Sequence, residues 1–333
     1  MSLKLSFLDK CPIAEGANAT QALQHAVEIA QKVEALGFYR YWVAEHHLTE
    51  RYASPSPELV LAWLLPQTQN IRLGSGGVML QHYSPYKVAE NFNVLATLGG
   101  QRIDLGVGKA PGGLPKSTQA LQRGLHQDEK GDFRQQLQLL QQHLQARSLT
   151  EDPEHLPATP IPEHSAELFL LGASVESAIL AAELNWNFVF AAHLNGNQQV
   201  LKEALAAFKQ RNSHKKAIIA LQIVVAETRQ QAEKWAEDLS VWTLQLANGQ
   251  KVKVLSEQMA HEFAEQAQSE IASLQKEALN IVKGSAQEVR QQLSALYQQH
   301  QIDELIVEIP LSEHQQRLAA LDLLANVADL AAA

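Results

Sequence analysis

The sequence predicts an α/β fold, specifically a (β/α)8 barrel (TIM barrel) with insertions after its fourth and seventh strands. Short apolar runs rich in β-branched residues alternate with amphipathic helical patterns along all 333 residues. No segment rich in Pro, Gly and Ser divides the chain into halves, so we predict one domain over residues 1–333. A doubly wound open sheet in two domains is the competing architecture.

The clearest βαβ unit runs from residue 71 to residue 113. Its apolar strands are residues 71–80 and 102–107, and both carry glycines where we expect their carboxyl ends. Ser84 and Pro85 are suitable as N-cap and first residue of the helix between them, and Gly99-Gly100 is suitable as its end. A right-handed crossover makes the two strands parallel and brings their carboxyl ends side by side. We therefore expect a functional site at these ends.

The other elements follow the same alternation. Before this unit we expect strands at 3–8 and 39–44 and helices at 18–36 and 56–65. After it we expect strands at 167–171, 188–191, 217–226 and 305–309, with helices after each, at 172–184, 197–211 and 285–300 and a last helix with Leu318, Leu321, Leu324 and Val327 inward. Ser285 and Glu288 form a capping box for one of these helices.

Two stretches interrupt the alternation. Residues 114–165 contain one amphipathic helix and a Pro-rich segment at 153–162. Residues 228–282 are interpreted as mostly helical and polar, and they are too long for a simple crossover. Both follow a strand end, where a barrel carries its active site, so we expect them to form a lid and a wall there.

The composition excludes several classes of partner. With 27 Lys and Arg against 36 Asp and Glu, the net charge is −9, which argues against a nucleic acid or an anionic membrane surface. Cys11 is the single cysteine, so no internal disulfide can form. The first residues lack the architecture of a signal peptide, and no apolar run is long enough to span a membrane. We expect a soluble, cytoplasmic protein.

Three titratable residues, Glu45, His46 and His47, follow the second predicted strand directly. Consecutive titratable groups at the carboxyl end of a barrel strand favour a functional role over an ordinary ion pair or a buried structural histidine. A metal site is not expected, because successive strand residues point to opposite faces and no HxH or HxxxH set lies nearby.

Gly76 and Gly77 interrupt an otherwise β-branched strand. Glycine weakens a strand and marks a bulge or a close approach of a ligand or another backbone. A flat aromatic ligand is one candidate for that approach, and a barrel corner that needs small residues is the alternative.

The loop after the fourth strand contains Gly108, Lys109 and Ala110. Two nucleotide-binding motifs fail here: Pro111 replaces the third glycine of G-x-G-x-x-G, and Ile103 and Ala110 break the P-loop pattern. What remains is a lysine flanked by glycines at a strand end, suitable as a point charge for a phosphate.

The fifth strand leads into a helix whose first residues are Ala173, Ser174, Val175, Glu176 and Ser177. Free N–H groups and the helix dipole favour an anion at such a position, although Ser174 is equally suitable as an ordinary N-cap. Lys109 and Ser174 follow adjacent strands, so one phosphate could contact both. This coincidence favours a phosphorylated cofactor.

These motifs together carry a family likeness. The chain resembles the bacterial luciferase-like flavin monooxygenases, and among them the short single-barrel oxidoreductases with E-H-H after strand two and G-[RK]-x-P-G after strand four. Further matching segments extend the likeness over nearly the whole chain, namely residues 41–44, 84–90, 171–174 and 284–305.

The resemblance implies FMN at the mouth of the barrel. It implies a cis peptide bond at Gly76-Gly77 beneath the flavin, and contacts to the flavin edge from Glu45. It implies a phosphate site made by the loop of Gly108, Lys109 and Ala110 and the helix start at residues 173–177. Arginine is usual in the family at the position of Lys109, and lysine lacks the bidentate fork of arginine.

The activity implied by the resemblance is that of a flavin-dependent monooxygenase. It would take reduced FMN from a separate flavin reductase and insert one oxygen of O2 into a small organic substrate. His46 would be the catalytic base or proton shuttle, and His47 and His82 would face the substrate. A homodimer is also expected from the resemblance.

Three alternatives stay open. One is an oxidoreductase dependent on the deazaflavin F420, whose polyglutamyl tail fits an acidic chain less well. Another is a non-catalytic flavin-binding protein on the same barrel. The third is a barrel enzyme that acts on a sugar phosphate and binds no flavin.

Overall fold

The computed structural model describes residues 4–125, 130–145 and 156–328. In it, eight parallel strands close into a barrel. Neighbouring strands follow the chain order, and the last barrel strand closes the ring between the first and the seventh. The barrel strands are β1 (Lys4–Asp9), β2 (Arg40–Val43), β3 (Arg72–Met79), β4 (Ile103–Gly108), β5 (Glu167–Gly172), β6 (Asn187–Ala191), β7 (Ala217–Ala226) and β12 (Glu304–Glu308). The predicted fold class is therefore confirmed.

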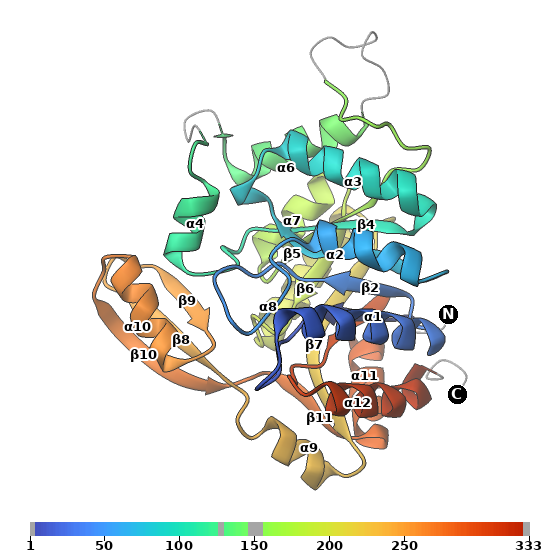
Figure 1. Ribbon diagram of the computed structural model, residues 1–333, viewed down its shortest axis with the longest axis vertical. Helices are drawn as coiled ribbons and strands as arrows, with labels where there is room; N and C mark the ends of the chain where they lie inside the picture. The colour runs from blue at the N-terminus through green and yellow to red at the C-terminus, as the bar shows by residue number, and fades with distance from the viewer. Residues whose placement is uncertain (1–3, 126–129, 146–155, 329–333) are drawn as a thin grey trace.

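Helices surround this barrel (Figure 1). Those that follow the strands are α1 (Ala19–Ala35), α2 (Pro57–Leu64), α3 (Pro85–Gly99), α7 (Val175–Glu183), α8 (Gln198–Arg211), α11 (Ala286–His300) and α12 (His314–Ala328). The predicted capping box of α11 is present, with the side chain of Ser285 accepting from the N–H of Glu288. The predicted positions Leu3, Pro153 and the side chain of Val327 lie outside the described part of the chain.

Alternate residues of the barrel strands point into and out of the barrel. The inward set forms a cluster separate from the main core between strands and helices. Its members are Leu8, Trp42, Ala44, Phe169, Val189, Ile218, Ala220 and Ile306. The centre of the barrel is thus packed with side chains, and ligands are confined to its two ends.

A buried network of charges closes the amino-terminal end of the barrel. The guanidinium of Arg40 donates to both carboxylate oxygens of Glu304, at 2.7 and 3.0 Å, and to Asp104 at 2.7 Å. All three side chains are fully buried. Burial by itself lowers the pKa of Arg40, but the neighbouring Asp104, Glu304 and Glu167 carboxylates outweigh it and raise that pKa above its usual value. The site must therefore lie at the opposite, carboxyl-terminal end.

The two insertions, called the first and second excursion from here on, follow β4 and β7, as predicted. The second excursion is not mostly helical. Residues 240–278 form a three-stranded antiparallel sheet, β10 (Ile271–Ala278), β8 (Ser240–Leu246) and β9 (Lys251–Val254), flanked by α9 (Arg229–Ala236) and α10 (Glu257–Gln266). β11 (Ile281–Ser285) then pairs with the carboxyl half of β7. β9 has one buried residue and β10 has none, so these two strands lack the period-2 pattern of a half-buried strand, which explains the wrong interpretation.

The two excursions pack against each other. The first contains α4 (Pro115–Leu121) and α6 (Phe133–Gln145). Leu114 before α4 belongs to the same buried cluster as Leu244 and Phe263 of the second excursion, and the N–H of Lys116 donates to Gln266 at 3.1 Å. Figure 1 shows α4 beside the small sheet. No helix among the described residues is long and apolar enough to cross a membrane.

Candidate functional site

Glu45 connects the ends of β2 and β3 through hydrogen bonds. Its buried carboxylate accepts hydrogen bonds from Nε2 of His47 at 2.8 Å, the hydroxyl of Tyr83 at 2.9 Å and the backbone N–H of Met79 at 3.1 Å. A carboxylate only accepts, so Nε2 of His47 carries the proton. These contacts make Glu45 a positioning residue, and its predicted contact with the flavin edge stays a prediction.

His46 continues the inward-facing series of β2 into the mouth of the barrel. Its ring packs on the ring of Tyr52, with centroids 4.7 Å apart, and its buried Nδ1 has no hydrogen-bond partner among the described residues. Burial, reinforced by the charges of Lys10, His47 and His193, lowers the pKa of His46 to about 3. The imidazole is therefore neutral at physiological pH and has one ring nitrogen available to a ligand.

A cluster of polar side chains that the sequence analysis missed lines the same mouth. Nζ of Lys10 lies 2.7 Å from Oε1 of Glu308, and Nε2 of Gln222 donates to Oε2 of Glu308 at 3.1 Å. Oε1 of Gln222, a residue only 5 % exposed, has no partner among the described residues. The charges of Glu308 and Lys10 also act on His193, which belongs to this cluster.

The alternation of the strands could have revealed this cluster. Lys10, Gln222 and Glu308 each lie two residues after a member of the inward-facing cluster, Leu8, Ala220 and Ile306. Since strand side chains have a period of 2, each of these polar residues had to point into the mouth.

The stability of the protein should depend on pH through His46 and His193, two half-buried histidines of the mouth. Burial lowers the pKa of His193 to about 4 and that of His46 to about 3, whereas both are near 6.5 in the unfolded chain. Below pH 6.5 the unfolded state thus binds protons that the folded state does not, and stability falls by up to about 1.4 kcal/mol per pH unit for each histidine. Urea unfolding of His193→Gln between pH 6.5 and 4.5 should show a shallower loss than the unsubstituted protein. Equal slopes would contradict the neutral state of His193 in the folded protein.

Gly76 and Gly77 lie at the mouth, and the peptide bond between them is cis, as predicted. The register of β3 against β4 shifts at this point. A Cβ on Gly76 would lie 2.5 Å from Leu8, and one on Gly77 would lie 2.8 Å from the carbonyl oxygen of Gly106. The packing of the barrel itself thus requires glycine at both positions, whatever ligand lies above them.

The end of β4 presents an exposed cation. Lys109 and Ala110 are exposed, and Nζ of Lys109 lies 6.0 Å from the ring of Phe133, with no carboxylate within 4 Å among the described residues. A Cβ on Gly108 would meet only the sulfur of Met79, at 3.7 Å. The end of β4 therefore has both a positive charge and free space for an anionic ligand.

The beginning of α7 on the adjacent strand β5 has the capping box of an ordinary N-cap. Ser174 accepts from the N–H of Ser177 at 3.2 Å, and Ser177 donates its hydroxyl to the carbonyl of Ser174 at 2.8 Å. The exposed carboxylate of Glu176 is bonded to its own N–H and to the hydroxyl of Ser174, which lowers its pKa. Ala173 and Val175 flank this turn. The N-terminus of α7 thus already attracts a carboxylate, and a phosphate would have to displace it.

His82 is engaged in holding the β4–α4 loop. Its Nε2 donates to the carbonyl of Pro111 at 2.8 Å, and its Nδ1 accepts from Gln122 at 3.0 Å. The ring of His47 lies 6.0 Å away, edge to face. With both nitrogens occupied in the protein, the geometry gives His82 a structural role; the predicted substrate contacts of His82 and His47 stay predictions.

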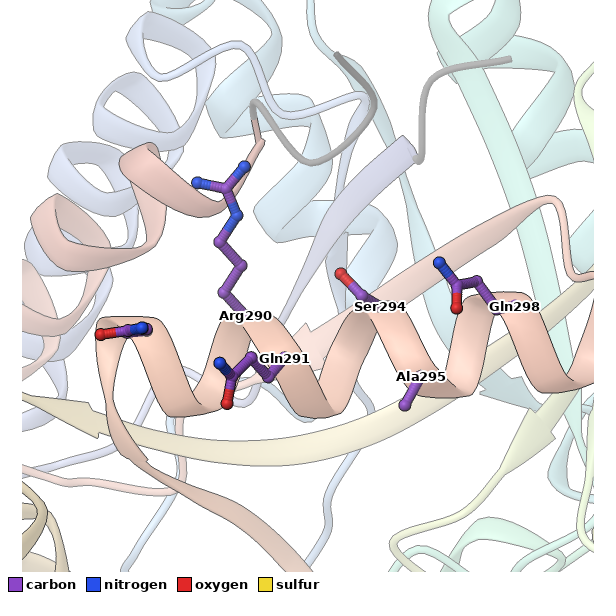
Figure 2. Close-up of a pocket in the computed structure, with 6 residues that line it drawn as sticks. Arg290, Gln291, Ser294, Ala295 and Gln298 are labelled. Carbon is purple, nitrogen blue, oxygen red and sulfur yellow. The ribbon is translucent and has the colours of Figure 1, made fainter. Parts of the chain in front are cut away.

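The outer face of α11 offers no comparable chemistry. A shallow hollow of about 570 Å³ lies on the outer face of α11, where Figure 2 shows Gln291, Ser294 and Gln298 projecting from one helix. It contains no pair of acid and base. Among the described residues, no group of three His, Cys, Asp or Glu side chains could hold a metal ion.

Comparison with known sequences gives matches over almost the whole chain. The family described as luciferase-like monooxygenase matches residues 4–304. The N-acetyl-S-alkylcysteine monooxygenase of Bacillus subtilis is 38% identical over 329 residues, which cover 97% of this chain and 98% of the relative.

Known structures agree on the fold. The apo form of MsnO8 has a TM-score of 0.79 and 28% identity, covering 98% of this chain and 99% of that one. The oxygenating constituent of 3,6-diketocamphane monooxygenase of Pseudomonas putida, in complex with FMN, has a TM-score of 0.70 and 16% identity, covering 98% of each chain. An F420-dependent secondary alcohol dehydrogenase has a TM-score of 0.67 and 14% identity, also covering 98% of each.

Proposed function

From the chain's membership of the luciferase-like monooxygenase family, we propose that it is a monooxygenase that uses reduced FMN and O2 to oxygenate a small organic substrate. One oxygen atom of O2 would be added to the substrate and the other released as water, with two electrons supplied by reduced FMN. A separate flavin reductase would supply the reduced FMN, and the chain would act as a homodimer.

The observation that carries the proposal is the polar mouth of the barrel. Nδ1 of His46 and Oε1 of Gln222 are buried there without partners among the described residues, which is costly unless a ligand bonds to them. The exposed Lys109 and the N-terminus of α7 lie on the adjacent strands β4 and β5. These residues fit a polar ring system with an anionic tail.

In this arrangement Lys109 and the first N–H groups of α7 would hold the phosphate of FMN, which would displace the carboxylate of Glu176 from the helix N-terminus. Bound reduced FMN would supply the electrons for activating O2. His46, neutral and fixed on the ring of Tyr52, would accept and return a proton at its free ring nitrogen. The packed excursions after β4 and β7 would exclude water from the mouth.

The test is an anaerobic titration of the purified protein with oxidised FMN, reduced FMN and F420, followed by admission of oxygen. We expect reduced FMN to bind, and oxygen uptake to be coupled to product when a substrate is present. Binding of F420 alone would replace this proposal with an F420-dependent reaction. Binding of flavin with release of hydrogen peroxide only, whatever the substrate, would favour a non-catalytic flavin-binding protein.

The Lys109→Arg variant should bind FMN more tightly than the unsubstituted protein. Arginine presents a planar fork that contacts two phosphate oxygens at once, whereas lysine is a single point charge. We expect a decrease in Kd of about 3- to 10-fold, measured by quenching of flavin fluorescence. Riboflavin lacks the phosphate and is the matched control, so an equal gain for riboflavin would contradict the assignment of Lys109 to the phosphate.

A further inference from the structure

A pocket of about 350 Å³ opens at the carboxyl ends of β1 and β12, beside the mouth of the barrel. This volume falls in the range of about 300–1,000 Å³ typical of small-molecule sites. Its apolar wall comes from Trp235 and Leu239 of the second excursion and from Pro310 and Leu311 after β12. Tyr52 also lines it, and the ring of Tyr52 packs on the ring of His46, so a single side chain separates the pocket from the proposed catalytic residue.

The polar lining of this pocket favours an anion. Arg317 is only 2 % exposed and donates through one nitrogen to Asp9 at 2.8 Å, but its Nε has no partner among the described residues. Arg51 lines the pocket at its exposed rim and has no carboxylate within 4 Å in the described part of the chain. Arg317 also lies in the first turn of α12, where the helix dipole favours negative charge.

The carboxylates of the same pocket are already neutralised. Asp9 accepts from Arg317 and from the hydroxyl of Tyr41, and Glu308 is paired with Lys10 and accepts from Gln222. After these pairs are formed, the charge of Arg51 and the Nε–H of Arg317 are left over. The pocket thus has one net positive charge for a ligand.

The position of this pocket separates it from the proposed phosphate site. In the strand order, β1 and β12 lie across the barrel from β4 and β5, which carry Lys109 and the start of α7. The residues proposed to hold the phosphate of FMN therefore do not line this pocket, which is open to a second ligand.

We propose that this pocket binds the carboxylate of the substrate, and that the substrate is an N-acylated amino acid with a thioether side chain, whose sulfur is directed past Tyr52 toward His46. This inference rests on the proposed function, and the name of the Bacillus subtilis relative specifies a substrate of this class. Arg51 and Nε of Arg317 hold the carboxylate, and Trp235 and Leu239 pack against the apolar part.

The experiment is a calorimetric titration of the flavin-free protein with N-acetyl-S-methylcysteine and with its methyl ester. We expect the acid to bind at least about tenfold more tightly than the ester, because a charge-assisted hydrogen bond is lost with the carboxylate. Arg51→Gln should weaken binding of the acid about tenfold and leave the ester unchanged. Arg211→Gln, an exposed arginine on α8, is the matched control and should change neither.

The possible outcomes separate the two proposals. Equal binding of acid and ester, no binding of either, or no effect of Arg51→Gln would overturn the carboxylate pocket. Displacement of the acid by equimolar inorganic phosphate would also overturn it, because any anion would then bind. If the acid binds as expected but reduced FMN and oxygen do not oxygenate it, the pocket stands and the proposed function fails.

Discussion

Replacing His46 with alanine is expected to lower the rate of product formation by at least about 100-fold while FMN binding is retained. The ring lies at the mouth on Tyr52, and none of the described residues bonds to its Nδ1, so its loss leaves no partner unpaired. The side chain holds no part of the proposed phosphate site on β4 and β5. The substitution should therefore remove a proton shuttle without removing the cofactor.

The measurement combines flavin titration with a reductase-coupled assay of product and hydrogen peroxide. His214→Ala removes an exposed histidine before β7 and is the matched control, which should behave as the unsubstituted protein. Full product formation in the His46→Ala variant would show that this residue is not catalytic. Loss of FMN binding in the same variant would place His46 in the cofactor site instead.

The pH profile adds an independent check on this assignment. Since burial lowers the pKa of His46 to about 3, the free base persists through the physiological range. If activity falls on the acid side with a midpoint near pH 6.5, the group that titrates must then be another one. The same midpoint should be found in any His46 variant that keeps residual activity. If the fall of activity near pH 6.5 is absent from the His46 variant, the assignment of a neutral imidazole to His46 is contradicted.

The elements that the sequence predicts correctly are those with a strong hydrophobic pattern. Runs such as Ala217–Ala226 are apolar throughout because both faces of a barrel strand are buried, and they are recognisable for that reason. The strand Lys251–Val254 has one buried residue, and Ile271–Ala278 has none. Such strands are stabilised by pairing with Ser240–Leu246, and pairing leaves no local pattern to recognise.

The candidate site divides in a similar way. Glu45, His46 and His47 are consecutive at the end of a predicted strand, so they could be found before the structure was known. Lys10, His193 and Glu308 come from three distant segments and meet only when the barrel closes. The contact of Glu45 with the N–H of Met79 has the same origin, because it depends on the pairing of β2 with β3.

Replacing Arg40 with methionine is expected to cost about 3–5 kcal/mol of the free energy of unfolding. Methionine fills a similar volume, but it leaves the carboxylates of Asp104 and Glu304 buried without their shared cation. Among the described side chains, Asp104 keeps the guanidinium of Arg72 and the indole of Trp42 as donors, whereas Glu304 keeps the uncharged hydroxyl of Ser6. The loss therefore falls mainly on Glu304, because its buried charge is left with a neutral donor that cannot offset the desolvation cost.

Urea unfolding of Arg40→Met against Arg134→Met measures this effect with a matched control. Arg134 forms an ion pair with Glu183 at 2.6 Å, as short as those of Arg40, but both partners are about half exposed. An exposed pair contributes about 0–1 kcal/mol, because water solvates its ions equally well when they are separated. The two variants thus differ in burial and hardly at all in contact distance. Similar losses in both would mean that water reaches the amino-terminal end of the barrel. A loss of several kcal/mol confined to Arg40→Met would establish that this end is sealed, which leaves the carboxyl-terminal mouth as the entrance for flavin, oxygen and substrate.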